Sequence, residues 1–452
     1  MENLRQLSKG SELYKRMYSS LYALLFLTIL LGLSVLLESC TDQCEIRNEY
    51  VYFEPVYTSL SDVRVVSVEN PQPIKHAGKI YIKDQWLFVN EPGEGIHVIN
   101  NSNPAAPKPE QFIKIPGNYD LAVKGNILYA DSYIDLVAID ISDIHQVSEV
   151  NRIENIFSNY SSLGFAVDAQ RGVVTTWQEN KEVKVYKDDC DANVQPWGGI
   201  FYREGIAFLA ADAASFNKSA AITPGNGSVS GVGGSMARFT INSNHLYALN
   251  GAEVHAINVT DERNPVAGTK TNIAWDMETI FPYKNNLFIG SMSGMHILDV
   301  SNPSSPQKIS TYEHVRVCDP VVVQDELAFV TLRSGTQCQG FTNQLEVIDI
   351  TNLTQPTLLH TYSMSNPHGL GIDGNTLFIC DGDDGLKIFD ISKINEIDKN
   401  QLAHYQGINT YDVIPYNNVL IMTGADGIFQ YDYSNPKKVS LLSKIELVNA
   451  EE

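Results

Sequence analysis

The sequence predicts an all-β protein, a β-propeller of about eight four-stranded blades behind an N-terminal export segment. Three observations predict it. A short apolar string that ends in Asp or Asn recurs along the chain, further apolar segments precede it, and a turn rich in Ser, Asn and Pro follows it. After residue 40 no segment shows the 3.6-residue period of an amphipathic helix.

The recurring string is predicted to form one strand of each blade. Its eight copies occur at intervals of 40, 47, 71, 41, 50, 41 and 42 residues. They occupy residues 96–100, 136–140, 183–187, 254–258, 295–299, 345–349, 386–390 and 428–432. Because the copy at 183–187 is degenerate, a propeller of seven blades, with this copy absorbed into a long insertion, is the alternative.

The segments around the string complete the repeat. One turn before it lie β-branched and aromatic residues such as Ile127-Leu128-Tyr129-Ala130, and another apolar segment precedes these. After it comes Ser/Thr-Asn/Asp-Pro, as in Ser102-Asn103-Pro104, a turn before a further strand. Four antiparallel strands per about 41 residues are the unit of a propeller blade. Residues 62–68 are expected to complete the last blade and so remove an exposed edge.

The first 39 residues are predicted to be a secretory signal. Two basic residues precede an uncharged stretch, residues 17–37, as in an exported protein. The stretch ends in Leu-Glu-Ser-Cys, which resembles the lipobox of bacterial lipoproteins, so Cys40 is expected to carry lipid. An uncleaved membrane anchor is the alternative. Residues 40–61 then form a tether, and residues 62–452 form the propeller domain.

The charge balance argues against nucleic acid as a partner. Lys and Arg together number 32, against 53 Asp and Glu, which gives a net charge of -21 at pH 7. A chain this acidic repels phosphate backbones unless a local patch reverses the sign.

The string Ile-Asp-Ile/Val-Ser-Asn-Pro, at this spacing, resembles the LVIVD-repeat family of bacterial envelope proteins over about residues 76–447. The resemblance implies a propeller at the cell envelope. Together with the lipobox it implies attachment to a membrane, expected to be the outer membrane, through lipidated Cys40. It implies no activity for individual positions.

A candidate ligand site is predicted at one mouth of the central channel. The inner strands of a propeller line this channel, so the residues that begin them surround one opening. Convergent polar groups in such a place suit a cation or a polar ligand. The candidate residues are Asp120, Arg238, Glu278, Asp319, His368 and Asp412.

No catalytic residue, metal or cofactor is predicted. Residues 290–294 put Met where a hydrolase nucleophile elbow needs Ser, and the glycine-rich residues 225–234 fit no phosphate-binding motif and are expected to form a flexible loop. His97, His255 and His296 share one position of the repeat, so they lie in different blades. The carboxylates of residues 381–385 are interpreted as a hairpin turn rather than a Ca²⁺ site.

Two cysteines are expected to form a disulfide. Cys318 and Cys338 flank one pair of predicted strands, and an exported protein meets an oxidising compartment. The bond would close a loop of about 20 residues and stabilise the fold by about 3 kcal/mol.

The long insertion, residues 188–235, is the candidate partner surface. Its aromatic content is too high for a disordered segment, and Trp197, Tyr202 and Arg203 are of the types that dominate interface energetics. The alternative is a structural flap that completes an irregular blade.

These features favour a non-enzymatic binding module for a protein or glycan partner, anchored by lipid outside the cytoplasm. The alternative is an envelope hydrolase or lyase that uses the carboxylates and His368 at the channel mouth. Enzymes built on propellers draw single residues from several blades, so the absence of a compact catalytic motif does not exclude this alternative.

Overall fold

A computed structural model describes residues 43–157, 167–168, 170–189, 232–235, 237–314, 320–334 and 342–448, with seven residues between 19 and 28. The chain divides into two units. One unit comprises Met1–Glu54 with Trp177–Ile206, and the other comprises Pro55–Thr176 with Ala207–Glu452. In the described part of the chain, no helix has the length and apolar character needed to cross a bilayer.

The predicted propeller is confirmed. The described residues form eight antiparallel sheets, of which seven contain a meander of four strands, named blades 1 to 7 in chain order. Blades 1 to 3 consist of β3 (Ile80–Lys83), β4 (Trp86–Glu91), β5 (Gly95–Asn100) and β6 (Lys108–Lys114); β7 (Leu121–Lys124), β8 (Ile127–Ser132), β9 (Asp135–Asp140) and β10 (Ser148–Ile153); and β14 (Phe239–Asn242), β15 (His245–Asn250), β16 (Glu253–Asn258) and β17 (Val266–Asn272).

The later blades repeat this plan. Blades 4 and 5 consist of β18 (Met277–Tyr283), β19 (Asn286–Ser291), β20 (Gly294–Asp299) and β21 (Gln307–Glu313); and β22 (Val321–Gln324), β23 (Leu327–Leu332), β24 (Gln344–Asp349) and β25 (Thr357–Ser363). Blades 6 and 7 consist of β26 (Leu370–Asp373), β27 (Thr376–Cys380), β28 (Leu386–Asp390) and β29 (Gln401–Tyr405), with the helix η3 (Ile397–Lys399); and β30 (Thr410–Tyr416), β31 (Val419–Gly424), β32 (Gly427–Asp432) and β33 (Ser440–Glu446).

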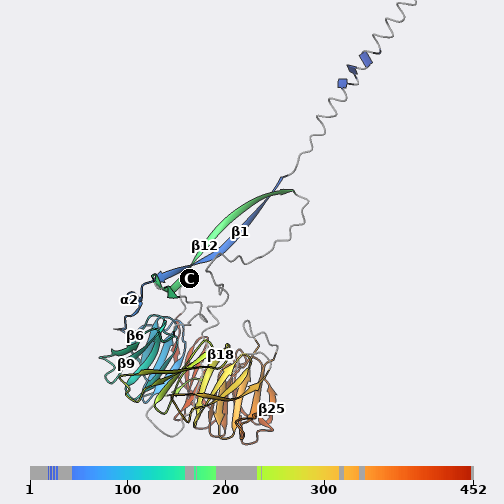
Figure 1. Cartoon of the computed structure of the whole chain (residues 1–452). Coiled ribbons are helices and arrows are strands. Elements are labelled where there is room, and N and C mark those ends of the chain that lie inside the picture. The colour runs from blue at the N-terminus through green and yellow to red at the C-terminus, as the bar shows by residue number, and fades with distance from the viewer. Residues whose placement is uncertain are drawn as a thin grey trace, which may run out of the picture. The chain divides into compact units, whose positions relative to one another are not determined.

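The eighth sheet has three strands, in the order β1 (Gln43–Thr58), β12 (Gly172–Asp189) and β11 (Val167–Asp168). Figure 1 shows β1 and β12 as a long antiparallel pair. The degenerate copy of the string at 183–187 lies in β12, outside the four-strand blades. The number of four-strand blades therefore matches the seven-bladed alternative. The segment predicted as a tether, residues 40–61, is mostly occupied by the paired strand β1.

The marker residue of each repeat closes a turn. The carboxylate of Asp140 accepts a hydrogen bond from the backbone N–H of Ser142 at 2.8 Å, and Asp299 accepts one from Ser301 at 2.7 Å. Hydrogen bonds to Ser301 lower the pKa of Asp299. Asp and Asn recur at this position because their short side chains bond to the backbone two residues on.

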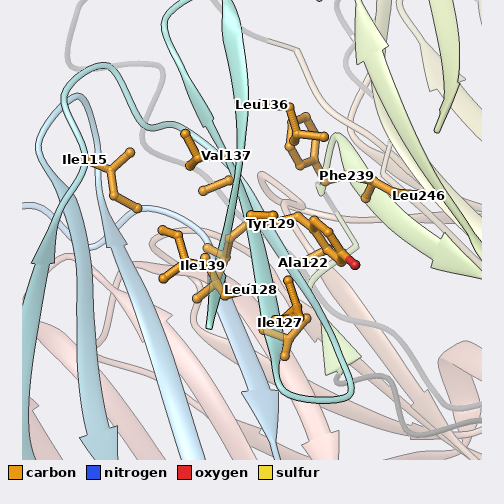
Figure 2. Packing of buried hydrophobic residues seen from close by; sticks show 14 of the residues in the cluster. Ile115, Ala122, Ile127, Leu128, Tyr129, Leu136, Val137, Ile139, Phe239 and Leu246 are labelled. Atoms are coloured by element: carbon orange, nitrogen blue, oxygen red, sulfur yellow. The ribbon is translucent and has the colours of Figure 1, made fainter. Parts of the chain in front are cut away.

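Side-chain packing joins neighbouring blades through their first three strands. Tyr129 and Leu128 of blade 2 are fully buried in a cluster that also holds Phe239 and Leu246 of blade 3, as Figure 2 shows. Between blades 7 and 1, the residues Ile414, Ile421 and Ile428 pack with Ile80, Ile82 and Leu87. Blade 7 is thus packed against blade 1, and the ring of four-strand blades closes.

The prediction that residues 62–68 complete the last blade is wrong. The helix α2 (Leu60–Val63) takes up the start of this segment, and β2 (Ser67–Glu69) pairs with β6 at the outer edge of blade 1. Blade 7 already has four strands of its own. The two ends of the propeller meet instead at a single parallel bridge between Ile74 and Leu447, where the Val448 N–H donates to the Ile74 carbonyl at 2.9 Å.

The end of the insertion lies at the inner edge of blade 1. The short strand β13 (Val232–Gly233) pairs with β3, and Val232 is 3% exposed. A Cβ on Gly233 would approach the Tyr81 ring to 2.8 Å, so only glycine fits here. Ser235 is fully buried and accepts a hydrogen bond at 3.4 Å from the backbone N–H of Leu370 in blade 6. Residues 232–234 are thus built into the propeller, contrary to the expectation of a flexible loop, whereas residues 225–231 lie outside the described part of the chain.

Candidate functional site

Ionisable residues lie at or near the start of the inner strand in five consecutive blades. Asp412 belongs to blade 7, Lys79 directly precedes the inner strand of blade 1, and Asp120, Arg238 and Glu278 follow in blades 2, 3 and 4. Along these five consecutive blades the signs run negative, positive, negative, positive, negative. We call these five residues the mouth residues.

The mouth residues influence one another's charge. The charge of Lys79 lowers the pKa values of Asp120, Glu278 and Asp412, although burial has a larger, opposite effect on each. Arg238 likewise acts on Glu278 and on Lys79. The structure therefore brings together the mouth residues, which come from five different blades.

Asp120 holds blades 2 and 3 together. Its carboxylate accepts hydrogen bonds from the backbone N–H groups of Leu121 at 2.7 Å and Phe239 at 3.2 Å, and from that of Arg238. Burial raises the pKa of this carboxyl group to about 6, against the attraction of Lys79. Asp120 is thus mainly a structural link, with a protonation state that is sensitive near neutral pH.

Glu278 is the extra residue of a β-bulge in β18, because Met277 and Thr279 pair with the adjacent residues Ser291 and Gly290. Bulges of this kind redirect a side chain. Burial raises the pKa of Glu278 to about 7, although the nearby charge of Arg333 opposes this and that of Asp276 adds to it. Glu278 remains half-buried rather than sealed from solvent.

Asp412 is fully buried, and neither of its carboxylate oxygens has a hydrogen-bond partner of normal geometry among the described residues. Burial raises its pKa well above the usual range, and the Val413 N–H and the charge of Lys79 only partly oppose this. A carboxyl group in such surroundings favours its protonated form.

His368 lies beside this group. Its side chain is 2% exposed, and its ring centroid is 5.7 Å from that of Tyr411. The backbone holds it in place, since its N–H donates to the Cys380 carbonyl at 2.7 Å and its carbonyl accepts from the Thr331 hydroxyl at 2.6 Å.

Several predicted residues lie outside the described part of the chain, so the predictions about them stay predictions. They are Cys40, Trp197, Tyr202, Arg203, Cys318, Asp319 and Cys338.

Sequence reasoning missed Lys79, Arg333 and Asp276. Lys79 directly precedes the strand Ile80–Lys83, at the position that Asp120 holds before β7. Extending the alignment of inner strands to the first blade would have found it. Arg333 and Asp276 lie in connecting segments, for which the repeat gives no register.

The histidines and the acidic turn keep their structural interpretation. His97 contacts Glu91 at 3.0 Å within blade 1, and His296 contacts the Thr311 hydroxyl at 2.9 Å within blade 4. The buried carboxylate of Asp381 accepts backbone N–H groups and contacts Lys387 Nζ at 2.5 Å. These contacts satisfy the side chains within single blades.

Comparison with known proteins identifies the repeat. The LVIVD repeat is found at residues 117–154, 283–314, 340–364 and 368–394. A search of curated proteins gives no match.

Solved structures resemble the chain at low identity. Sqt1 of Saccharomyces cerevisiae is 7% identical, with 84% of this chain and 87% of that chain covered and a TM-score of 0.49. The computationally designed Ika8 protein is 10% identical, with 84% and 93% covered and a TM-score of 0.46. BamB from Moraxella catarrhalis is 11% identical, with 84% and 89% covered and a TM-score of 0.43.

At such low identity, the resemblance to these three proteins does not indicate a shared function. The four LVIVD repeats coincide with blades 2, 4, 5 and 6. Each contains the Asp that ends the recurring string and begins the turn described above. The chain is therefore a β-propeller that carries LVIVD repeats in four of its blades.

Proposed function

We propose that this protein is a lipid-anchored binding module of the cell envelope, which captures a protein or glycan partner at the mouth of its propeller. The observation that carries the proposal is the convergence of ionisable side chains from five blades, with Asp412 buried and without a hydrogen bond of normal geometry among the described residues. Concave sites with a few convergent polar groups and perturbed pKa values are typical of binding sites.

The end of the insertion supports binding rather than passage through the ring. β13 adds to the edge of β3 that faces the propeller axis, and Ser235 reaches the backbone of Leu370 in blade 6. Residues 232–235 thus contact both blade 1 and blade 6 near the propeller axis.

Capture from native envelopes tests the proposal. Tagged protein would be cross-linked in cells, purified and compared with the double variant Lys79→Ala, Glu278→Gln. The proposal expects a partner with the wild type and none with the variant, while Asp325→Asn, an exposed site at the other end of an inner strand, keeps the partner. Equal capture by all three proteins would contradict a binding mouth.

The insertion is a second proposed contact surface for the same partner. Trp197→Ala with Tyr202→Ala would abolish capture while shifting the melting temperature by only a few degrees, because the blades do not depend on a recognition loop. Collapse of the thermal transition in this variant would instead assign the insertion to a structural flap.

An envelope hydrolase or lyase is the second candidate. Asp120 and Glu278 have pKa values raised to about 6 and about 7, the range that suits general acid and base catalysis at neutral pH. An enzyme would release reducing ends or unsaturated products from envelope glycans and lose this activity in Glu278→Gln. If the protein binds envelope glycans but releases no product from them, the binding module is favoured over the enzyme.

A further inference from the structure

Two buried side chains on the mouth side of blades 3 and 4 lack hydrogen-bond partners among the described residues. Asn250 ends β15 and is 1% exposed, and both its amide nitrogen and its amide oxygen lack a partner. Asp276 directly precedes β18 and is 5% exposed, and both its carboxylate oxygens lack a partner. Buried polar groups without partners are rare because each costs stability, so each calls for an explanation.

The two side chains belong to one region. The loop before β18 is tied to the turn after β15 by the Ile273 N–H, which donates to the Ala252 carbonyl at 2.9 Å. Arg238 reaches the end of β15, since its guanidinium donates to the Leu249 carbonyl at 3.3 Å. The charge of Asp276 acts on Glu278, so the region is continuous with the mouth residues.

The missing partners define the ligand's chemistry. The Asn250 amide needs both an acceptor and a donor, and Asp276 needs donors. An ammonium group only donates and an anion only accepts, whereas a hydroxyl group does both. The whole chain also carries a net charge of -21, which disfavours an anionic ligand.

An exposed aromatic residue directly precedes Asp276 in the chain. Trp275 is 67% exposed, which is unusual for so large an apolar surface. The apolar face of a sugar ring stacks on such a side chain, while its hydroxyl groups reach the polar atoms beside it. A sugar can satisfy all three residues at once, because its apolar face suits Trp275 and its hydroxyl groups supply the donors and acceptors that Asp276 and Asn250 lack.

We propose that Trp275, Asn250 and Asp276 form a subsite for a neutral sugar residue of a glycan. This inference rests on the proposed binding function and narrows it: the partner is a polyhydroxylated chain without net charge. Trp275 stacks against the ring, Asp276 accepts hydroxyl hydrogens, and Asn250 both donates and accepts.

Titration calorimetry with neutral tetrasaccharides of glucose, mannose and galactose tests the proposal on the full-length protein. Trp275→Ala is expected to weaken binding at least about tenfold, and Trp275→Phe to restore most of it. Asp276→Asn is expected to weaken binding to a similar degree. Leu441→Ala, which removes an exposed apolar side chain from the outer strand of blade 7, and Asp325→Asn are the matched controls and keep the wild-type affinity.

The salt dependence separates a sugar from a charged ligand. Affinity for a neutral sugar stays within about twofold between ~50 mM and ~500 mM salt, since no charges are paired in the complex. Tetralysine and tetraglutamate serve as charged probes. Salt-sensitive binding of tetralysine with no sugar binding would overturn the proposal in favour of a basic polypeptide.

Two further outcomes are informative. If no tetrasaccharide binds while envelope capture still depends on Lys79 and Glu278, the sugar subsite is wrong and the binding module stands. If the protein binds no tetrasaccharide and captures no envelope partner, and crystals show only ordered water at Asn250 and Asp276, both the sugar subsite and the binding module are wrong.

Discussion

Asn101 and Gln430 exchange two hydrogen bonds across the junction of the first and last blades. The Asn101 amide donates to Gln430 Oε1 at 2.8 Å, and the Gln430 amide donates to Asn101 Oδ1 at 2.7 Å. Both side chains are buried, and 329 residues separate them in the chain. This pair closes the ring together with the Ser443 hydroxyl, which donates to the Pro104 carbonyl at 2.6 Å.

Replacing Asn101 with Ala is expected to destabilise the protein by about 1–3 kcal/mol, because it leaves the Gln430 amide buried without a partner. Urea denaturation measures the change. A double-mutant cycle with Gln430→Ala should give a coupling energy above about 0.5 kcal/mol. Gln355→Ala, at an exposed position, is the control. A coupling energy near zero would show that the Asn101–Gln430 pair does not stabilise the closed ring.

The repeat explains how much of the fold could be predicted. The period of the string places strands, and the Asp or Asn at its end predicts a local turn that Asp140 and Asp299 form through their own side chains. Both signals are local. The pairing of β2 with β6 was missed because an alternating strand pattern looks the same whichever edge it joins.

The candidate site was predicted in part for the same reason. Asp120, Arg238, Glu278 and Asp412 come from the repeat register, whereas Asn250 and Asp276 matter because of what fails to contact them. Burial without partners depends on how the ends of strands in blades 3 and 4 pack in three dimensions. A sequence pattern carries no signal for such an absence.

The carboxyl groups of Asp120 and Glu278 are expected to make stability fall as pH rises. Their folded-state pKa values, about 6 and about 7, lie above the unfolded values of about 4. The folded chain therefore holds protons that the unfolded chain releases, so their contribution is complete below about pH 4 and is lost as pH rises through 6 and 7.

Melting temperatures of wild type and Glu278→Gln, measured from about pH 4 to about pH 8, test this linkage. The variant should lose less stability than the wild type over this range, because its amide does not titrate. Parallel curves would show that Glu278 titrates normally in the folded protein.

Lipidation of Cys40 is expected from the lipobox. Growth with a labelled fatty acid should label the wild type and not Cys40→Ala, and the variant should move to the soluble envelope fraction. Label that persists in the variant would contradict a lipid anchor at this cysteine.

A disulfide is expected between Cys318 and Cys338. Peptide mapping without reductant, on protein exported to an oxidising compartment, should recover the two joined peptides. The control is the same protein after reduction, and alkylation of both thiols before reduction would exclude the bond. Its loss should affect the loop around residues 333–343 more than the blade, since ladder hydrogen bonds and burial hold β22 to β25.

The most direct test of a binding mouth is an experimental structure of the protein purified from its own envelope under conditions that keep ligands bound. We expect density for a bound molecule in contact with Lys79 or Glu278 and extending toward Trp275 and Asp276. A partner seated on the outer strands of the blades, with only water at the mouth residues, would contradict the account.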